Sequence, residues 1–292
     1  MSDNGKDRAA LPVSLILEGG GMRGAYTAGV LDAFLDHDIW FQRLYGVSAG
    51  ACHAVSYLSN QRGRAIRTVT DYLRDKHYAG LYSLITTGDF FGVEMIYHTI
   101  PEKLIPYDYD AFPQSPTEMF AVLTDCETGE AVYYPVREMR EDGMTAIRAS
   151  SSLPFLSRMV EIGGRLYLDG GIADSIPVKK AKADGLPRGV VILTRHREYR
   201  KGGASMKELT KLFYRKYPAL AEAILSRGER YNATLDYIEE AEAAGELFVI
   251  RPKEPVTIGR LEKDPDKLMA LYRQGIQDGE AQMEALKAFC KA

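Results

Sequence analysis

The feature that most restricts the fold of this chain is a five-residue turn, Gly46-Val47-Ser48-Ala49-Gly50. The aromatic and branched residues before it, 40–45, are typical of a short buried strand, and apolar residues within 51–58 recur at helical spacing. A strand that turns sharply into a helix needs glycines beside the turn, because a Cβ there would crowd the neighbouring backbone. The pattern therefore predicts an α/β fold that presents Ser48 at the end of a strand.

Ser48 stands in the sequence context of a nucleophilic serine at a strand-to-helix turn. In that geometry the serine Oγ faces a cleft beside a helix N-terminus, where negative charge is favoured. Glycine, serine and alanine are common residues, so the same stretch also fits an ordinary strand–helix turn. The two interpretations are separated by whether partners for Ser48 occur elsewhere in the chain.

Composition limits the class of protein. The chain has 292 residues, of which 46% are hydrophobic, enough for one large α/β domain or a domain with an appendage. Its net charge of −3 argues against a general nucleic-acid binder. The separated Cys52, Cys126 and Cys290 indicate neither a disulfide framework nor a metal site, and we expect no metal and no cofactor.

Nothing in the sequence indicates export or membrane insertion. The polar residues 1–8 lack the apolar core of a signal peptide, and no apolar run reaches membrane-spanning length. We therefore expect a cytoplasmic protein, with any membrane contact being peripheral.

A second glycine-rich turn, Gly19-Gly20-Gly21-Met22-Arg23-Gly24, follows an apolar strand at 13–17 and precedes an amphipathic helix. Successive N–H groups in such a turn form an anion-binding concavity. Its Gly-x-Gly-x-x-Gly spacing fits a dinucleotide site, which requires an acidic residue at the end of the second strand. That strand ends instead in the Ser48 turn, and no P-loop lysine follows the glycines. The most economical interpretation is an oxyanion hole, with both turns at the carboxyl ends of neighbouring parallel strands.

Asp169 is the candidate partner of Ser48. A hairpin turn at Gly163-Gly164 leads into a strand that ends at Asp169, and Gly170-Gly171 allow a close backbone approach. Alone, Asp-Gly-Gly fits an ordinary turn. With the serine and the glycine loop upstream, Asp169 becomes a candidate general base.

The chain changes character after the apolar segment 189–194, which we expect to form the strand that closes the core sheet. The basic segment, 195–216, carries eight Lys and Arg residues against two Glu. It fits a solvated helix face and loop, or a contact with anionic lipid. The remainder is mainly helical, with one strand at 247–252. We predict a catalytic domain at 13–195 and a mainly helical extension at 196–292.

The motifs at 19–24, 46–50 and 169–171 together resemble the patatin-like phospholipase family, and the similarity covers about 13–195. Stretches at 124–129 and 149–154 resemble it too, and 196–292 is similar to the extension of a bacterial branch. The resemblance implies a three-layer αβα fold with a mostly parallel central sheet.

The resemblance also implies a Ser–Asp dyad without histidine. In this dyad Ser48 is the nucleophile, Asp169 is the base, and the loop Gly20-Gly21-Met22-Arg23 supplies oxyanion donors. Where the family often has asparagine after Asp-Gly-Gly, this chain has Ser175 before Ile176-Pro177. We therefore expect different hydrogen bonding in the loop that follows Asp169.

These motifs predict a serine acyl hydrolase that cleaves esters of lipids or phospholipids through an acyl-enzyme. One alternative is an α/β-hydrolase with a Ser48–Asp169–His196 triad, since that order of residues fits the fold. Arg195 and Arg197 flank His196 and disfavour an imidazolium there. The other alternative is a module that binds a lipid or nucleotide through the glycine loop without hydrolysis.

Overall fold

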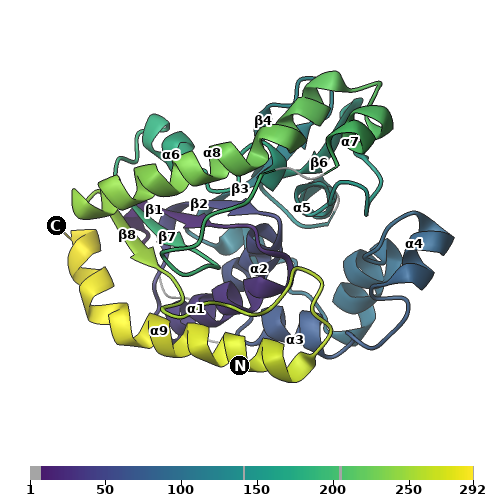
Figure 1. Cartoon of the computed structure of the whole chain (residues 1–292). Helices are drawn as coiled ribbons and strands as arrows, with labels where there is room; N and C mark the ends of the chain where they lie inside the picture. Colours follow the sequence, from purple (N-terminus) through teal and green to yellow (C-terminus); the bar gives the residue numbers. More distant parts are fainter. Residues whose placement is uncertain (1–7, 141, 204–205, 292) are drawn as a thin grey trace.

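The computed structural model describes residues 8–140, 142–203 and 206–291, so residues 1–7, and 204–205 of the basic segment, lie outside the described residues. The strands form one mixed sheet in the order β5-β6-β3-β2-β1-β7-β8, with β4 beside β3 (Figure 1). Neighbours from β3 to β8 in this order are parallel, whereas β4 and β6 run antiparallel to β3, and β5 runs antiparallel to β6. The strands are β1 Leu11–Leu17, β2 Phe41–Val47, β3 Glu118–Asp125, β4 Ala131–Val136, β5 Val160–Ile162, β6 Arg165–Asp169, β7 Gly189–Ile192 and β8 Leu247–Ile250.

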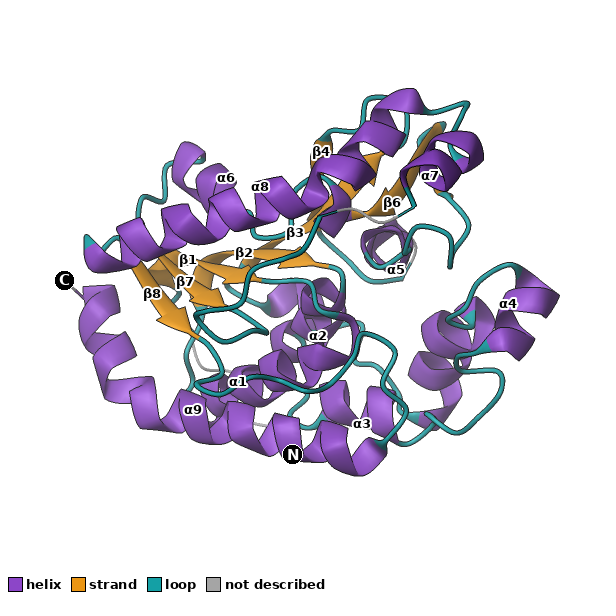
Figure 2. Ribbon diagram, in the orientation of Figure 1, coloured by secondary structure: helices purple, strands orange, loops and turns teal. Residues whose placement is uncertain are grey.

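Helices cover both faces of the sheet (Figure 2). Helices α1, α2 and α9 lie on one face, and α6 and α8 lie on the other. This arrangement confirms the expected three-layer αβα fold. None of the described helices combines the length and apolar character that are needed to cross a bilayer. The helices are α1 Gly24–Asp36, α2 Ala49–Leu58, α3 Arg64–Thr70, α4 Leu81–Thr87, α5 Asp142–Ser150, α6 Val178–Ala183, α7 Lys207–Phe213, α8 Pro218–Ala243 and α9 Pro265–Lys291, with 3-10 turns η1 Gly21–Arg23, η3 Phe112–Gln114 and η4 Gly170–Ile172 and the π-helix η2 Met95–Leu104.

Strand β1 illustrates why the sheet is the middle layer. Leu15 and Leu17 pack into the core that contains α1 and α2, whereas Ile16 packs into the core that contains α6 and α8. All three side chains are fully buried. Successive side chains of a strand point to opposite faces, so a sheet covered on both faces requires consecutive apolar residues, as at Leu15-Ile16-Leu17.

The prediction that segment 189–194 closes the sheet is wrong. Strand β7 pairs in parallel with β1 on one side and with β8 on the other, so β8 is the edge strand at this end. The short apolar run of β8 does not reveal its partner, because strand pairing depends on packing between distant segments. The C-terminal region therefore completes the sheet.

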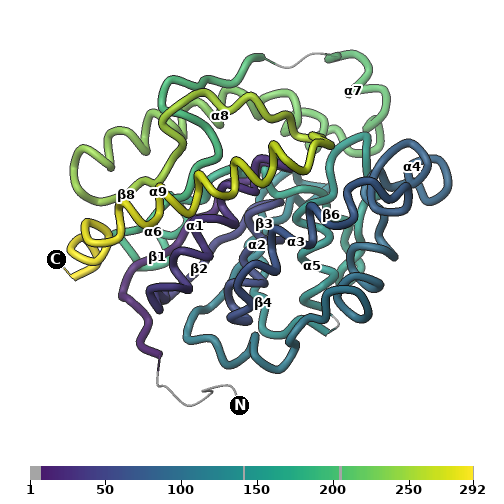
Figure 3. The backbone as a smooth tube through the Cα atoms, turned by 90° about the horizontal axis from the view of Figure 1, so that it is seen from below, coloured from purple at the N-terminus to yellow at the C-terminus, as the bar shows by residue number. Residues whose placement is uncertain are grey.

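Helix α9 returns across the molecule and packs along α1 (Figure 3). The two helices approach closely at Gly29 and Gly275. A Cβ at either position would lie 2.1 Å from a backbone oxygen of the opposite helix, that of Tyr272 or Tyr26 respectively. The C-terminal region is thus joined to the rest of the chain by a strand pair and by a close helix–helix contact.

Candidate active site

Ser48 occupies the turn between β2 and α2 in the strained geometry that its sequence predicts. Its backbone has φ 55° and ψ −123°, a region that residues other than glycine rarely adopt. The flanking glycines make the turn possible. A Cβ at Gly46 would lie 2.7 Å from the Cα of Ala51, and one at Gly50 would lie 2.8 Å from the Leu17 oxygen.

Ser48 and Asp169 meet in the structure. Asp169 ends β6, and the Ser48 hydroxyl donates a 2.6 Å hydrogen bond to Asp169 Oδ2. The second carboxylate oxygen, Oδ1, accepts the Gly171 N–H at 2.8 Å. Both side chains are buried, with Ser48 6% and Asp169 1% exposed. In this geometry the carboxylate oxygen Oδ2 accepts the hydrogen bond of a buried serine hydroxyl, the arrangement in which a carboxylate can act as a base toward a serine.

Two hydroxyl side chains hold the backbone on either side of this pair. The Ser48 N–H donates to Ser150 Oγ at 3.0 Å, and the Ser150 hydroxyl donates to the Val122 carbonyl at 2.8 Å. The Thr124 hydroxyl donates to the carbonyl of Asp169 at 2.8 Å. Ser150 and Thr124 lie in stretches that resemble a family, but the sequence gives them no role, because their hydrogen-bond partners lie in distant segments.

Contacts with β3 and with Ser175 fix the loop after Asp169. A Cβ at Gly170 would lie only 2.0 Å from the Val122 oxygen, so the loop packs directly on β3. The Ser175 hydroxyl donates to the Gly171 carbonyl at 2.7 Å. Ser175, at the place where the sequence departs from the expected asparagine, thus makes a hydrogen bond within this loop.

The glycine loop lies beside Ser48 at the end of β1. A Cβ at Gly19 would lie 3.0 Å from the Ser48 Cβ, and one at Gly24 would lie 2.7 Å from His53 Nε2. Gly21 has φ 56°, in the left-handed region that favours glycine. The loop is therefore held against Ser48 and His53 by contacts that leave no room for a side chain at Gly19 or Gly24.

The N–H groups of this loop differ in their hydrogen bonding. The Met22 amide donates to the Arg260 carbonyl at 3.1 Å, and the Arg23 amide donates to the Gly20 carbonyl at 3.4 Å. Within the described residues, the amides of Gly20 and Gly21 donate to no acceptor. Of the four residues that the sequence predicted as oxyanion donors, Gly20 and Gly21 are therefore the ones whose N–H groups are available to a ligand in this conformation.

His196 is not part of the arrangement. Its ring lies edge-on to Tyr199 with 6.2 Å between ring centroids, and its buried Nδ1 has no partner among the described residues. Ser48 and Gly171 donate to the two oxygens of Asp169. The structure therefore does not assemble the alternative triad. The described part of the chain also gathers no group of three or more His, Cys, Asp or Glu side chains suited to a metal.

A cavity of about 130 Å³ opens next to Ser48. Its wall comes largely from α2, α3 and η2 and the segment between α3 and η2. The wall is mainly apolar and includes Val69, Phe91, Ile96, Tyr97, Ile100 and Leu153. A cavity of this character suits a hydrocarbon chain.

His53 lies in this wall and is 4% exposed. Burial lowers its pKa to about 4, against about 6.5 in an unfolded chain. Between these values the unfolded chain binds a proton that the folded protein does not. The free energy of unfolding should therefore fall as pH falls, by about 2 kcal/mol for this group between pH about 7 and pH about 5.

Urea unfolding of the wild type and His53→Gln at the two pH values measures this effect. We expect the variant to lose about 2 kcal/mol less than the wild type on acidification. The exposed His98 provides the matched control, and His98→Gln should follow the wild type. An identical pH dependence of wild type and His53→Gln would contradict the assignment.

Residues 15–182 match the family model of patatin-like phospholipases. The chain belongs to the patatin-like phospholipase family. The matched range contains the glycine loop, Ser48 and Asp169. Residues 217–291 match a second model, described as a domain of unknown function, DUF6363.

Individual relatives share part of this sequence. The uncharacterized protein YjjU of Escherichia coli K12 is 30% identical over 188 residues, which are 62% of this chain and 52% of YjjU. An uncharacterized NTE family protein of Mycobacterium tuberculosis H37Rv is 26% identical over 60% of this chain and 29% of its own length. Lysophospholipase NTE1 of Saccharomyces cerevisiae is 25% identical over 94% of this chain and 16% of its own length. The chain thus spans about half or less of these curated relatives.

Proposed function

We propose that this protein is a serine acyl hydrolase of phospholipase A type that cleaves carboxylic esters of lipids or phospholipids. Membership of the patatin-like phospholipase family supports a lipid hydrolase in general, and one relative is named a lysophospholipase. The observation that carries the proposal is the buried 2.6 Å hydrogen bond from Ser48 Oγ to Asp169 Oδ2. An apolar cavity adjoins it.

In the first half of the reaction, Asp169 accepts the Ser48 proton while Oγ bonds to the ester carbonyl carbon. The N–H groups of Gly20 and Gly21 stabilise the negative charge that forms on the carbonyl oxygen. Collapse of the tetrahedral intermediate breaks the bond to the alcohol, which leaves with the proton from Asp169. The acyl group remains on Ser48.

In the second half, water attacks the acyl-enzyme and Asp169 accepts a proton from it. The second tetrahedral intermediate collapses with cleavage of the bond to Ser48 Oγ, which takes the proton back from Asp169. The carboxylic acid is released and the resting pair is restored.

Covalent labelling with an alkyl fluorophosphonate tests this proposal. An activated serine displaces fluoride from phosphorus, so mass analysis should find one phosphonyl adduct, on the peptide that contains Ser48. Ser48→Ala should carry no adduct, while the control Ser115→Ala should be labelled like the wild type. Labelling that persists in Ser48→Ala would refute the assignment of the nucleophile.

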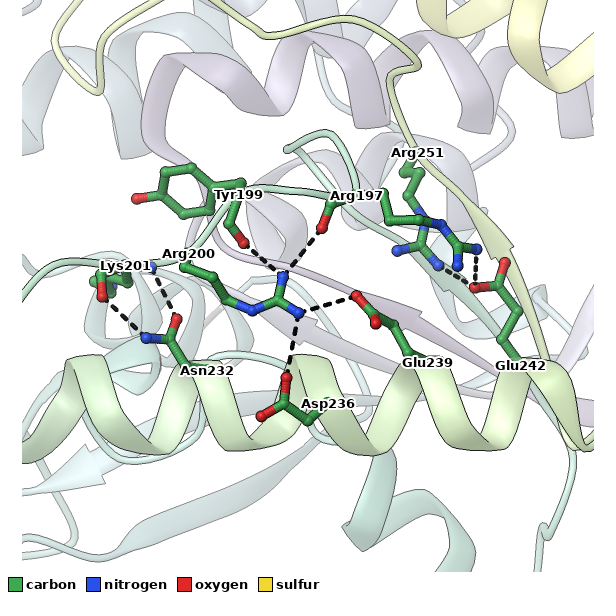
Figure 4. Close-up of polar contacts among 9 residues, drawn as sticks. All are labelled: Arg197, Tyr199, Arg200, Lys201, Asn232, Asp236, Glu239, Glu242 and Arg251. Carbon is green, nitrogen blue, oxygen red and sulfur yellow. Dashed lines mark hydrogen bonds and ion pairs between the residues drawn. The ribbon is translucent and has the colours of Figure 1, made fainter.

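The basic segment divides into two parts. Arg197 donates to Glu242 at 2.6 Å and Arg200 donates to Glu239 at 3.1 Å, so this part is folded against acidic residues of α8 (Figure 4). Charges used in these contacts are not free for a membrane. Among the described residues of the basic segment, those in and around α7 remain available for a peripheral contact with a membrane.

We propose that α7, together with α4, touches an anionic lipid surface. Leu212 and Phe213 of α7 are 64% and 62% exposed, and the exposed Lys211 stands beside them. Leu81 and Ile85 of α4 are 70% and 82% exposed. Both helices lie at the same end of the molecule in Figures 1 and 3. Exposed apolar groups interspersed with lysines suit the interface of an anionic membrane.

The double variant Leu212→Ser with Phe213→Ser should bind phosphatidylglycerol vesicles about tenfold more weakly or worse, because two apolar anchors are lost. Co-sedimentation with vesicles measures this. Leu104→Ser, at an exposed leucine outside α4 and α7, is the control and should bind like the wild type. Equal binding of the double variant and the wild type would show that α7 is not a docking surface.

A further inference from the structure

Four cationic side chains converge beside the glycine loop and the loop after Asp169. We call Arg23, Lys201, Arg227 and Arg260 the cation cluster. The guanidinium of Arg227 lies directly against Gly171, since a Cβ built there would be 2.7 Å from Arg227 Nη2. The charge of Arg260 acts on each of the other three, and that of Asp169 acts on Lys201 and Arg227. The cluster therefore adjoins the Ser48–Asp169 pair.

These cations lack counter-charges in direct contact. None of them makes an ion pair with the described residues. Arg23 is only 6% exposed, and its Nε and that of Arg227 are buried without a hydrogen-bond partner in the described part of the chain. A buried guanidinium without partners is unfavourable unless a ligand satisfies it.

The two carboxylates whose charges act on the cluster, Glu18 and Asp169, already accept other hydrogen bonds. Glu18 is buried and accepts hydrogen bonds from the Thr194 amide at 2.6 Å, the Thr194 hydroxyl at 2.9 Å and the Tyr231 hydroxyl at 2.7 Å. Asp169 accepts from Ser48 and Gly171. Both carboxylates thus use their oxygens elsewhere, and the three arginines of the cluster remain in excess.

Lys201 differs from the three arginines, because burial, followed by the charges of Arg227 and Arg260, lowers its pKa to about 6. Its amine is therefore largely neutral at pH 7 in the free protein, and a phosphate bound beside it would favour the charged form. Its backbone is held in place by Asn232, whose Oδ1 accepts the Lys201 N–H at 2.8 Å and whose Nδ2 donates to the Lys201 carbonyl at 3.0 Å (Figure 4). The loop segment that carries Lys201 is therefore held against α8 by these two hydrogen bonds.

We propose that the cation cluster binds the phosphate group of the substrate, on the alcohol side of the ester that Ser48 attacks. This rests on the proposed function. Guanidinium groups bind phosphate through paired, charge-assisted hydrogen bonds. The apolar cavity contains none of the four cations, so acyl chain and phosphate would occupy separate places around Ser48. A phosphate-bearing lipid would then be preferred over a neutral glyceride.

The C-terminal region would contribute two of the phosphate-binding side chains. Arg227 and Arg260 both lie within 217–291, the range that matches the domain of unknown function. Arg227 lies on α8. Arg260 lies in the loop before α9, and its own carbonyl accepts the Met22 N–H. Recognition of the phosphate would thus come from this region, and the nucleophile and base from the patatin-like part.

The test compares lysophosphatidic acid with a monoacylglycerol of the same short acyl chain, both as monomers in solution. We expect the wild type to have a kcat/KM at least about tenfold higher for the phosphate-bearing substrate. Arg227→Gln and Arg260→Gln should each reduce this ratio about tenfold. The readout is the ratio of the two kcat/KM values, because the loss of a charge beside Asp169 would change the rate of hydrolysis of both substrates. Arg260 is exposed, so its variant remains informative if Arg227→Gln fails to fold.

Arg273→Gln is the matched control, since Arg273 is exposed on α9 and has no ion pair with the described residues. Its substrate ratio should equal that of the wild type. A wild-type ratio near one, or a ratio that is unchanged in both cluster variants, would overturn the proposal.

Calorimetric titration with inorganic phosphate separates the remaining possibilities. Binding that weakens in Arg260→Gln, together with the substrate preference, supports the proposal in full. Binding without any substrate preference would mean that the cluster holds a free anion, and the assignment to the substrate would be wrong. Binding by a protein that hydrolyses no ester would refute the proposed function but support the anion site.

Discussion

Ser48→Ala should lower kcat/KM for p-nitrophenyl butyrate by a factor on the order of 10⁴ or more. The substitution removes the oxygen that forms the acyl-enzyme, while the glycine loop and the cavity remain. Any residual rate would come from binding and from the oxyanion donors alone. Ser115→Ala, distant from the site in sequence and structure, should keep the wild-type rate.

The backbone strain at Ser48 provides a second readout of the same residue. At φ 55° a glycine is unstrained, so Ser48→Gly should be as inactive as Ser48→Ala but more stable than the wild type by about 1 kcal/mol. Urea unfolding measures the gain. An inactive Ser48→Gly protein that is clearly folded excludes unfolding as the cause of lost activity. Hydrolysis that is indifferent to both substitutions would end the serine-hydrolase hypothesis.

Asp169→Asn is the second substitution with a large expected effect, a loss in kcat of about 10³-fold or more. The amide keeps the size of the side chain and an oxygen for the Gly171 N–H. It removes the negative charge of the carboxylate whose Oδ2 accepts the 2.6 Å hydrogen bond from Ser48 and would take its proton in the proposed mechanism. The loss should appear in kcat more than in KM, because the proton transfer occurs in the transition state.

His196→Ala is the comparison that separates a dyad from a triad. Its Nδ1 has no partner among the described residues, so we expect the variant to hydrolyse p-nitrophenyl butyrate at close to the wild-type rate. A loss as large as that of Asp169→Asn would instead indicate that His196 moves to Asp169 when substrate binds. The same assay on all variants, each checked for folding by circular dichroism, decides between the two mechanisms.

Local chemistry made much of the fold predictable. The mostly apolar segment 13–17 predicted a strand, and it lies in β1, whose Leu15 and Ile16 pack into opposite cores. The alternation of strand, glycine-rich turn and helix indicated parallel neighbours, which β1 and β2 are. These signals work because side-chain direction and helix periodicity repeat over a few residues.

The sequence predicted those parts of the candidate site that are tight turns. Glycine at 46 and 50 and around Asp169 marked positions where the backbone approaches other atoms too closely for a Cβ. Resemblance of the three motifs paired Ser48 with Asp169, and the structure places them in hydrogen-bond contact. Their roles in catalysis remain predictions that the substitutions above test.

The sequence by itself determined the strained turn at Ser48, the glycine loop and the acidic turn at Asp169, because each depends on backbone sterics within a few residues. Only the tertiary structure decided that β8 forms the sheet edge, that Arg227 lies beside Gly171, and that Arg260 lies beside the glycine loop. These outcomes depend on how distant segments pack. Charges scattered along a sequence become a site only when the whole sheet and its helices bring them to one place.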